Sequence, residues 1–373
     1  MQIGQGVKRP ASAGNLDAGG GAHVRLSDLA GRPDVRVQGV YAMVAPEVKS
    51  TRNGQDFLSC RLRDGSGECV AVMWSYDRAR FGEMTATGFV HVNGRSGEFN
   101  GQPQVIIDDA RAVEVSPEEL LEILPATERD RDDLFARAVR LLDSLDHPGM
   151  KALAKAYLAD ETLMERFRLA PAAQHMHHAF LGGLLEHTVE MMELADAMLP
   201  LVGRPGRWRP EPPAPGELPR PGEPAPPLDR DLVLLGLFIH DLAKVDELSV
   251  ERGFAYTADG HLVGHIARGV TRLRDKVRTL PEGTMSEEAV VLLEHILLSH
   301  HGRPEHGALK VPSTPEAVFV ASLDHLHAKT AMAIDAADRD AIPDGGLGPA
   351  EEIGPRHFGL ETRVYRPNPL REG

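Results

Sequence analysis

The chain has 373 residues, of which 26% are charged and only two are cysteines, and its net charge at pH 7 is −14. Two cysteines exclude a disulfide framework and a cysteine-rich zinc site. An acidic chain of this length accommodates two or three domains, and its bulk charge excludes a protein that coats nucleic acid through electrostatics alone.

The acidic residues are concentrated in the second part of the chain. Residues 1–113 hold 13 Lys and Arg against 12 Asp and Glu, which leaves 28 (41 − 13) against 43 (55 − 12) for the remainder. No apolar run approaches the roughly 20 residues that span a bilayer. No basic segment followed by an apolar one opens the chain as a secretion signal would. We therefore expect a soluble cytoplasmic protein that is not associated with a membrane.

The first 114 residues have the pattern of a small β-barrel that follows a disordered tail. Residues 1–22 are rich in Gly and Ala and lack periodicity, which predicts disorder. Within residues 23–114 the strand-like segments are 35–41, 57–63, 68–74, 89–94 and 104–107. Asp64-Gly-Ser-Gly67 predicts a four-residue hairpin loop between the second and third of them. Five short strands in about 90 residues predict a barrel of the OB type.

One face of this hairpin combines aromatic and basic side chains. Strand alternation places Phe57, Arg61 and Arg63 on the outer face, and Trp74 on the neighbouring strand joins them. The inner face is predicted to hold Leu58, Cys60, Leu62, Cys69, Ala71 and Met73. Single-stranded nucleic acid suits the outer face, because bases stack on aromatic rings and phosphates pair with arginines. The alternative is that Trp74 closes the barrel end and the arginines are solvated.

The pattern becomes helical after a short linker helix at 116–124. Apolar residues recur at three-to-four spacing in the segments 132–145, 149–167, 189–199, 232–239, 261–277, 286–299 and 315–338. Ten prolines within 203–228 predict an exposed insertion loop. Residues 341–373 are predicted to form a C-terminal extension. We expect a multidomain chain in which an all-β OB-like barrel (23–114) precedes an all-α helical bundle (129–340).

One predicted helix carries polar groups into the fold. The run from Leu232 to Ile239 contains only apolar residues and Gly, and it leads directly into His240 and Asp241. Burying an imidazole and a carboxylate unpaired costs several kcal/mol. Their polar atoms must therefore be paired with each other, with neighbouring groups or with a metal. For this pair alone, a hydrogen-bonded core pair is the simpler interpretation.

Other helical segments supply further groups that can bind a metal. These groups are His187, His265, His300, His301 and Asp324. Imidazole combined with carboxylate suits divalent ions such as Mn²⁺, Fe²⁺, Co²⁺ or Zn²⁺, and a carboxylate can bridge two of them. One such histidine is more often a satisfied core residue, but the recurrence of ligands over five helical segments favours a metal site.

The order His…His-Asp…His…His-His…Asp on a helical frame resembles the HD-domain superfamily of metal-dependent phosphohydrolases. Together with the barrel, the segments HHAFLGGLLEHT, HDLAK, LVGHI and SHHG are similar to the YhaM-type 3′→5′ exoribonucleases. The resemblance covers about residues 23–114 and 129–340. It implies an HD-domain phosphohydrolase of residues 129–340, interrupted by the loop 203–228.

The resemblance also implies roles for individual residues. One divalent ion would be held by His187, His240, Asp241 and Asp324, and a second by Asp241, His265, His300 and His301. Mn²⁺ is the first candidate, with Fe²⁺, Co²⁺, Mg²⁺ and Zn²⁺ as alternatives. The implied catalytic residues are Asp241, Lys244, which would steady the scissile phosphate, and His178, which would protonate the leaving group or support a ligand.

The implied reaction is the metal-dependent hydrolysis of single-stranded RNA from its 3′ end, which releases nucleoside 5′-monophosphates. Single-stranded DNA as a substrate and a homo-oligomeric state stay open. A nucleotide or cyclic-nucleotide phosphohydrolase is an alternative, although Gly-Arg-Pro follows His301 where a cyclic-dinucleotide enzyme would have Glu and a later Gly-Tyr-Pro. A non-catalytic OB-fold RNA-binding protein is another alternative, which the complete ligand set disfavours.

Overall fold

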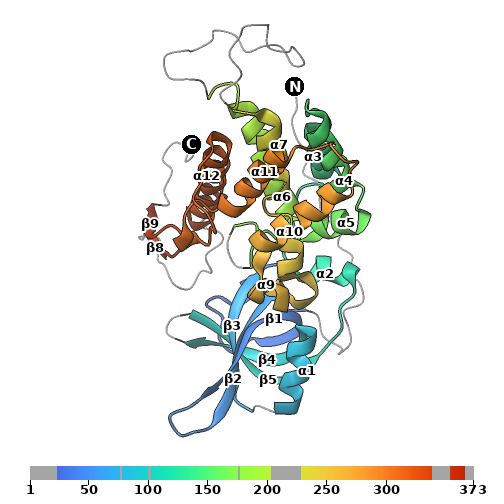
Figure 1. Ribbon diagram of the computed structural model, residues 1–373. Helices are drawn as coiled ribbons and strands as arrows, with labels where there is room; N and C mark the ends of the chain where they lie inside the picture. Colours follow the sequence, from blue (N-terminus) through green and yellow to red (C-terminus); the bar gives the residue numbers. More distant parts are fainter. Residues whose placement is uncertain are drawn as a thin grey trace, which may run out of the picture. The chain divides into compact units, whose positions relative to one another are not determined.

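The computed structural model describes residues 23–75, 78–99, 102–174, 177–202, 228–337 and 353–365. The predicted tail, residues 203–227 of the predicted loop, and residues 341–352 and 366–373 of the predicted extension lie outside these ranges. The chain divides into two compact units (Figure 1). The first runs to Pro125 and includes Glu251–Gly253, and the second begins at Ala126.

The first unit is a closed barrel of five strands, as the sequence predicts. Its strands are β1 (Arg36–Ser50), β2 (Asp56–Asp64), β3 (Gly67–Met73), β4 (Phe89–Phe99) and β5 (Gln102–Ala112). They pair in the order β1-β2-β3-β5-β4, and the long strand β1 pairs with both β2 and β4 to close the barrel. Only β3 and β5 run parallel. This small closed five-stranded architecture is that of an OB fold.

Strand alternation decides which side chains fill the barrel. The six residues predicted to point inward, Leu58, Cys60, Leu62, Cys69, Ala71 and Met73, are all buried. The prediction of a four-residue loop is wrong, because Asp64 and Gly67 are themselves paired and only Gly65 and Ser66 form the turn. The Asp64 carboxylate closes this turn by accepting hydrogen bonds from the backbone N–H groups of Ser66 (2.7 Å) and Gly67 (3.1 Å).

Two α-helices and a 3₁₀ helix at Leu26–Leu29 complete the described part of the first unit. Helix α1 (Arg78–Thr87) connects β3 to β4, and α2 (Pro117–Ile123) follows β5. The predicted linker helix at 116–124 is therefore confirmed. It begins at a capping box in which the Ser116 hydroxyl accepts from the backbone of Glu119 and the Glu119 carboxylate accepts from the backbone of Ser116.

The second unit is mostly helical, as predicted. Its helices are α3 (Arg131–Asp143), α4 (Pro148–Leu158), α5 (Glu161–Leu169), α6 (Gly183–Met198), α7 (Arg230–Ile239), α8 (Lys244–Glu247), α9 (Ala258–Leu262), α10 (Gly264–Arg278), α11 (Glu287–Ser299) and α12 (Pro315–Ala337). Two short hairpins accompany them, β6 (Leu248–Ser249) with β7 (Ala255–Tyr256) and β8 (Ile353–His357) with β9 (Thr362–Tyr365).

Helix α7 lies in the core of this unit (Figure 1). The Asp229 carboxylate caps its first turn by accepting from the backbone N–H of Leu232 at 2.9 Å. Every residue from Asp231 to Ile239 is buried, and the helix packs against α3, α4, α6, α11 and α12. Each large apolar side chain buried in this way contributes about 1.5–3 kcal/mol. The predicted apolar helix is confirmed, and it fixes the position of His240 and Asp241 at its end.

Two predicted helical segments are each divided in the structure. The segment 149–167 forms α4 and α5, because the Asp160 carboxylate accepts from the backbone of Leu163 and caps a new helix. The segment 261–277 is divided between α9 and α10, since Gly264 has a φ of 76° and interrupts the helical path. Apolar periodicity passes through both breaks, so it did not reveal them.

The structure also bears on the predicted membrane behaviour. Within the part of the chain that the structure describes, no helix combines the length and the apolar character needed to cross a membrane.

Candidate metal centre

The predicted ligands converge in the second unit on the carboxylate of Asp241. They come from α6 (His187), the C-terminal end of α7 (His240, Asp241), the start of α10 (His265), the end of α11 (His300, His301) and α12 (Asp324). We call these seven residues the Asp241 cluster. It brings together side chains that are up to 137 positions apart (324 − 187).

The two oxygens of Asp241 face different histidines. Oδ2 lies 3.4 Å from Nε2 of His240 and 3.8 Å from Nε2 of His187. Oδ1 lies 3.4 Å from Nε2 of His265 and 3.5 Å from Nε2 of His300. On the Oδ2 side, Nε2 of His187 is also 3.5 Å from Oδ1 of Asp324. A single carboxylate therefore separates two sets of donor atoms, which is the arrangement of a bridging ligand.

These separations suit atoms that share a metal ion. Two ligands held at about 2.1 Å from an ion in tetrahedral geometry lie about 3.4 Å apart. Good hydrogen bonds between such groups are shorter than this, at about 2.7–3.2 Å.

Unsatisfied buried atoms provide a test of whether the site fits a metal. Among the described residues, Asp241 Oδ1, His265 Nε2, His300 Nε2 and His301 Nδ1 are buried and have no hydrogen-bond partner. These four residues form one group whose ligand atoms all lie within 4.8 Å of one another. An unsatisfied buried polar group costs about 1–3 kcal/mol. A divalent ion would satisfy all four, so the donor set fits a metal.

The backbone fixes which nitrogen of two histidines is free. Nδ1 of His240 lies 2.6 Å from the carbonyl oxygen of Leu237, and Nδ1 of His300 lies 2.8 Å from that of Leu297. A carbonyl oxygen only accepts, so Nδ1 donates in both rings. In the neutral ring, Nε2 then keeps its lone pair and directs it toward Asp241.

The electrostatics of the cluster favour metal-binding protonation states. Burial lowers the pKa of His300 and brings the pKa of His301 to about 2. Burial alone would raise the pKa of Asp241, but the Lys244 ammonium and His240 hold it well below its usual value. The Lys244 Nζ lies 2.7 Å from Asp241 Oδ2. Burial alone would lower the pKa of His240, but Asp241 and Asp324 raise it above its usual value. An ionised carboxylate beside the neutral imidazoles of His300 and His301 is a donor set that divalent cations bind.

Three residues that the sequence analysis missed hold the ligands in place. Oε2 of Glu247 lies 2.9 Å from Nδ1 of His265. Nδ1 of His327 lies 3.1 Å from Nδ1 of His187, and Nε2 of the same ring lies 2.8 Å from Oε2 of Glu190. Such partners orient metal-binding histidines. A search one helical turn from each ligand would have found Glu190, three residues after His187, and His327, three residues after Asp324.

His178 lies beside the cluster, in contact with this supporting chain. Its ring stacks on His327 with centroids 5.3 Å apart, and its Nε2 lies 3.4 Å from Oε2 of Glu190. Its Nδ1 is buried and has no hydrogen-bond partner among the described residues. Gly183 permits this position, because a Cβ there would lie 2.1 Å from the His178 carbonyl oxygen.

The predicted nucleic-acid face of the barrel is present in part. The rings of Phe57 and Trp74 lie 4.8 Å apart, and Trp74 is 47% exposed. Arg61 is also exposed, 3.5 Å from Glu68. The predicted exposure of Arg63 is wrong, because its guanidinium is buried and donates to Glu68, its cross-strand partner on β3.

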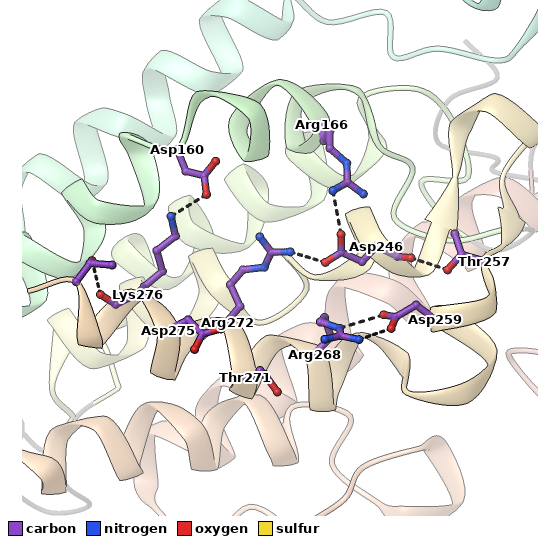
Figure 2. Close-up of a pocket in the computed structure, with 11 residues that line it drawn as sticks. Asp160, Arg166, Asp246, Thr257, Asp259, Arg268, Thr271, Arg272, Asp275 and Lys276 are labelled. Atoms are coloured by element: carbon purple, nitrogen blue, oxygen red, sulfur yellow. Dashed lines mark hydrogen bonds and ion pairs between the residues drawn. The ribbon is translucent and has the colours of Figure 1, made fainter.

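A separate pocket of about 680 Å³ lies along α10 and contains none of the cluster residues (Figure 2). Its charged lining consists of Arg166, Arg268, Arg272 and Lys276 with Asp160, Asp246, Asp259 and Asp275. Asp246 pairs with both Arg166 and Arg272, and Lys276 pairs with Asp160 at 2.8 Å. Four cations thus balance four carboxylates, so the pocket has no net charge that would attract an anion. Its ion pairs tie α10, which carries His265, to α5 and α8.

Comparisons with known proteins agree with this architecture. The HD domain family matches residues 184–329, which include the whole Asp241 cluster. Proteins named 3′-5′ exoribonuclease YhaM are similar over most of their length. The protein of Bacillus velezensis is 31% identical over 337 residues, which is 88% of this chain and 94% of the relative. The protein of Bacillus subtilis is 30% identical over 333 residues, with the same two coverages.

One solved structure is also similar to part of the chain. It is the solution structure of the second OB-fold domain of replication protein A from Methanococcus maripaludis, with 17% identity and a TM-score of 0.19. The similarity covers 26% of this chain and 98% of that one.

Proposed function

This chain belongs to the family of YhaM 3′-5′ exoribonucleases, and we propose that it is a metal-dependent enzyme that degrades single-stranded RNA from the 3′ end. Its products would be nucleoside 5′-monophosphates. The observation that carries the proposal is the carboxylate of Asp241, whose two oxygens face two different sets of buried histidines. Residues 23–114 would bind the strand and residues 129–340 would hydrolyse it.

Two divalent ions fit the donor set. One would be held by His187, His240, Asp241 and Asp324, and the other by Asp241, His265, His300 and His301. Mn²⁺ is the first candidate, and Fe²⁺, Co²⁺, Mg²⁺ or Zn²⁺ are alternatives, because mixed imidazole and carboxylate ligands suit several divalent ions. When bound, such ions supply a nucleophile at neutral pH and neutralise the charge of the phosphate.

The side chains around the cluster would position the substrate. The Lys244 ammonium, which is next to Asp241, would hold a non-bridging oxygen of the scissile phosphate and stabilise the charge that develops on it. His178 would deliver a proton to the departing 3′ oxygen, with Glu190 orienting its ring. Breaking the bond between phosphorus and the 3′ oxygen leaves the phosphate on the released nucleotide. This choice of bond accounts for 5′-monophosphates as products.

The barrel would bind the single strand. The exposed ring of Trp74 packs against the half-buried ring of Phe57, and Arg61 lies on the same hairpin. Bases stack on such rings without regard to sequence, and the arginine pairs with phosphate. Arg63 is left out of this proposed surface because it is buried against Glu68.

The test is a degradation assay on a defined substrate. A single-stranded RNA labelled at its 5′ end is incubated with metal-stripped protein, and Mn²⁺ is then added. We expect no cleavage before the addition and a ladder that shortens one nucleotide at a time from the 3′ end after it. Full activity in excess EDTA, or early release of the 5′ label as a mononucleotide, would contradict the proposal.

A further inference from the structure

Two aromatic rings that the proposed mechanism does not use lie at the surface of the second unit. The rings of Tyr256 and His261 have centroids 5.3 Å apart, and Tyr256 is 41% exposed. The next two residues, Leu262 and Val263, are 85% and 46% exposed. The segment therefore presents aromatic and apolar groups to solvent just before the candidate ligand His265.

This segment is firmly attached to the residue that orients His265. Tyr256 pairs with Leu248, which directly follows Glu247. The backbone N–H of Thr257 donates to the carbonyl oxygen of Glu247 at 2.9 Å. Helix α9 packs so closely on the same residue that a Cβ at Gly260 would lie 2.4 Å from the Glu247 carbonyl oxygen. The Glu247 carboxylate in turn holds Nδ1 of His265.

Charged residues beside the candidate centre shift the pKa of the Tyr256 phenol. Burial raises its pKa, the Glu247 carboxylate raises it further, and the Lys244 ammonium opposes both. The segment that carries this exposed ring therefore lies against Glu247, whose carboxylate contacts the candidate ligand His265.

We propose that Tyr256, supported by His261, forms a stacking site for a nucleobase next to the scissile phosphate. The inference rests on the proposed function and adds a substrate contact inside the catalytic unit, separate from the barrel. A ring face recognises any base, so the site would favour a nucleotide over an abasic residue and would not select a sequence. Stacking of one base contributes about 1–3 kcal/mol, which corresponds to at least about a 5-fold effect on kcat/KM.

The experiment compares two RNA substrates and three variants of the full-length protein. The substrates have the same sequence and carry either adenosines or abasic residues at the two 3′-terminal positions. Tyr256→Leu removes the ring, Tyr256→Phe keeps it, and Tyr365→Leu is the matched control because Tyr365 is an exposed tyrosine on β9. kcat and KM are measured for each pair, together with metal content and thermal melting.

We expect the wild-type protein to prefer the intact end by at least about 5-fold in kcat/KM. Tyr256→Leu should lose this preference by losing activity on the intact end alone, while Tyr256→Phe and Tyr365→Leu retain it. A wild-type protein that degrades both ends equally well would overturn the inference, even if Tyr256→Leu did not fold. Equal losses on both substrates, or reduced metal content in a folded Tyr256→Leu protein, would also overturn it. Failure of the proposed function looks different, because the wild-type protein would then degrade neither substrate.

Discussion

The ammonium nitrogen of Lys244 lies 2.7 Å from Oδ2 of Asp241, and both side chains are largely buried. The two residues are three positions apart, and the start of α8 brings them together. Attraction to Asp241 raises the pKa of Lys244 against the opposing effect of burial, so the amine stays charged. A fixed positive charge is therefore present at the edge of a site that is proposed to bind a phosphodiester.

Replacing this charge should lower turnover. Lys244→Met keeps the length of the side chain and removes the ammonium, so the developing charge on the phosphate loses one stabilising contact. We expect kcat to fall about 10²–10³-fold, with metal content unchanged because no candidate ligand is altered. Single-turnover hydrolysis and elemental analysis of the same preparation measure both quantities. Loss of metal in step with activity would show that Lys244 acts on the charge of Asp241 and not on the substrate.

The chain from His187 through His327 to Glu190 should control metal affinity. His327→Ala removes the ring that contacts Nδ1 of His187, and we expect divalent-ion affinity to fall about 10–100-fold. His325→Ala is the matched control, since His325 is on the same helix and its ring stacks on His306. Equilibrium dialysis against Mn²⁺ measures both variants. Equal affinities for the two would refute a supporting role for His327.

The barrel hairpin should contribute to binding through charge as well as stacking. Arg61→Ala removes one phosphate contact, so the slope of log K against log salt should become shallower by roughly 0.7. Arg80→Ala is a suitable control, because Arg80 is equally exposed and pairs with Asp109 on β5. Fluorescence anisotropy with a labelled oligonucleotide in EDTA gives the slopes without turnover. Identical slopes for the two variants would remove Arg61 from the proposed surface.

Asp64 should make the stability of the barrel depend on pH. Burial would raise the pKa of Asp64, but hydrogen bonds from His23, Ser66 and Leu26 lower it below its usual value. A carboxyl group whose pKa is depressed by folding stabilises the folded state above its unfolded pKa of about 3.9. That contribution disappears as the pH falls through the lower, folded value.

We therefore expect the barrel to lose stability below about pH 4, and Asp64→Asn to lack this part of the pH dependence. The free energy of unfolding of the barrel is measured at each pH by urea unfolding, which is followed on peptides of the barrel by pulsed hydrogen exchange. Asp56→Asn, at an exposed position on β2, is the control and should behave like the wild-type protein. The prediction would be contradicted if the free energy of unfolding of the barrel depended on pH in the same way in the wild-type protein and in Asp64→Asn.

The sequence predicted the barrel and the helical unit because both depend on local patterns. Alternation along β2 and β3 marks the inward residues, and the apolar run from Leu232 to Ile239 marks the central helix. The breaks at Asp160 and Gly264 were missed because each depends on a cap or on one backbone angle, which apolar periodicity does not encode.

Partners across the fold were harder to predict than the ligands. The ligand residue types were visible in the sequence, but the contact of His187 with His327 joins residues 140 positions apart. Arg63 was assigned to the outer face by alternation alone. The predicted hairpin already places Glu68 opposite Arg63, but alternation does not show that this pair brings the Arg63 guanidinium into a buried position.

The most direct test of the central claim is the metal content and nuclease rate of Asp241→Asn. This change keeps the size of the side chain and removes the charge that both sets of histidines face. The apolar face of α7 is untouched, so circular dichroism should show a folded protein. We predict that bound metal falls clearly below the wild-type amount and that turnover falls by at least about 10²-fold, while Asp275→Asn on α10 matches the wild-type protein. A folded Asp241→Asn protein with near-normal metal content and turnover would contradict the account.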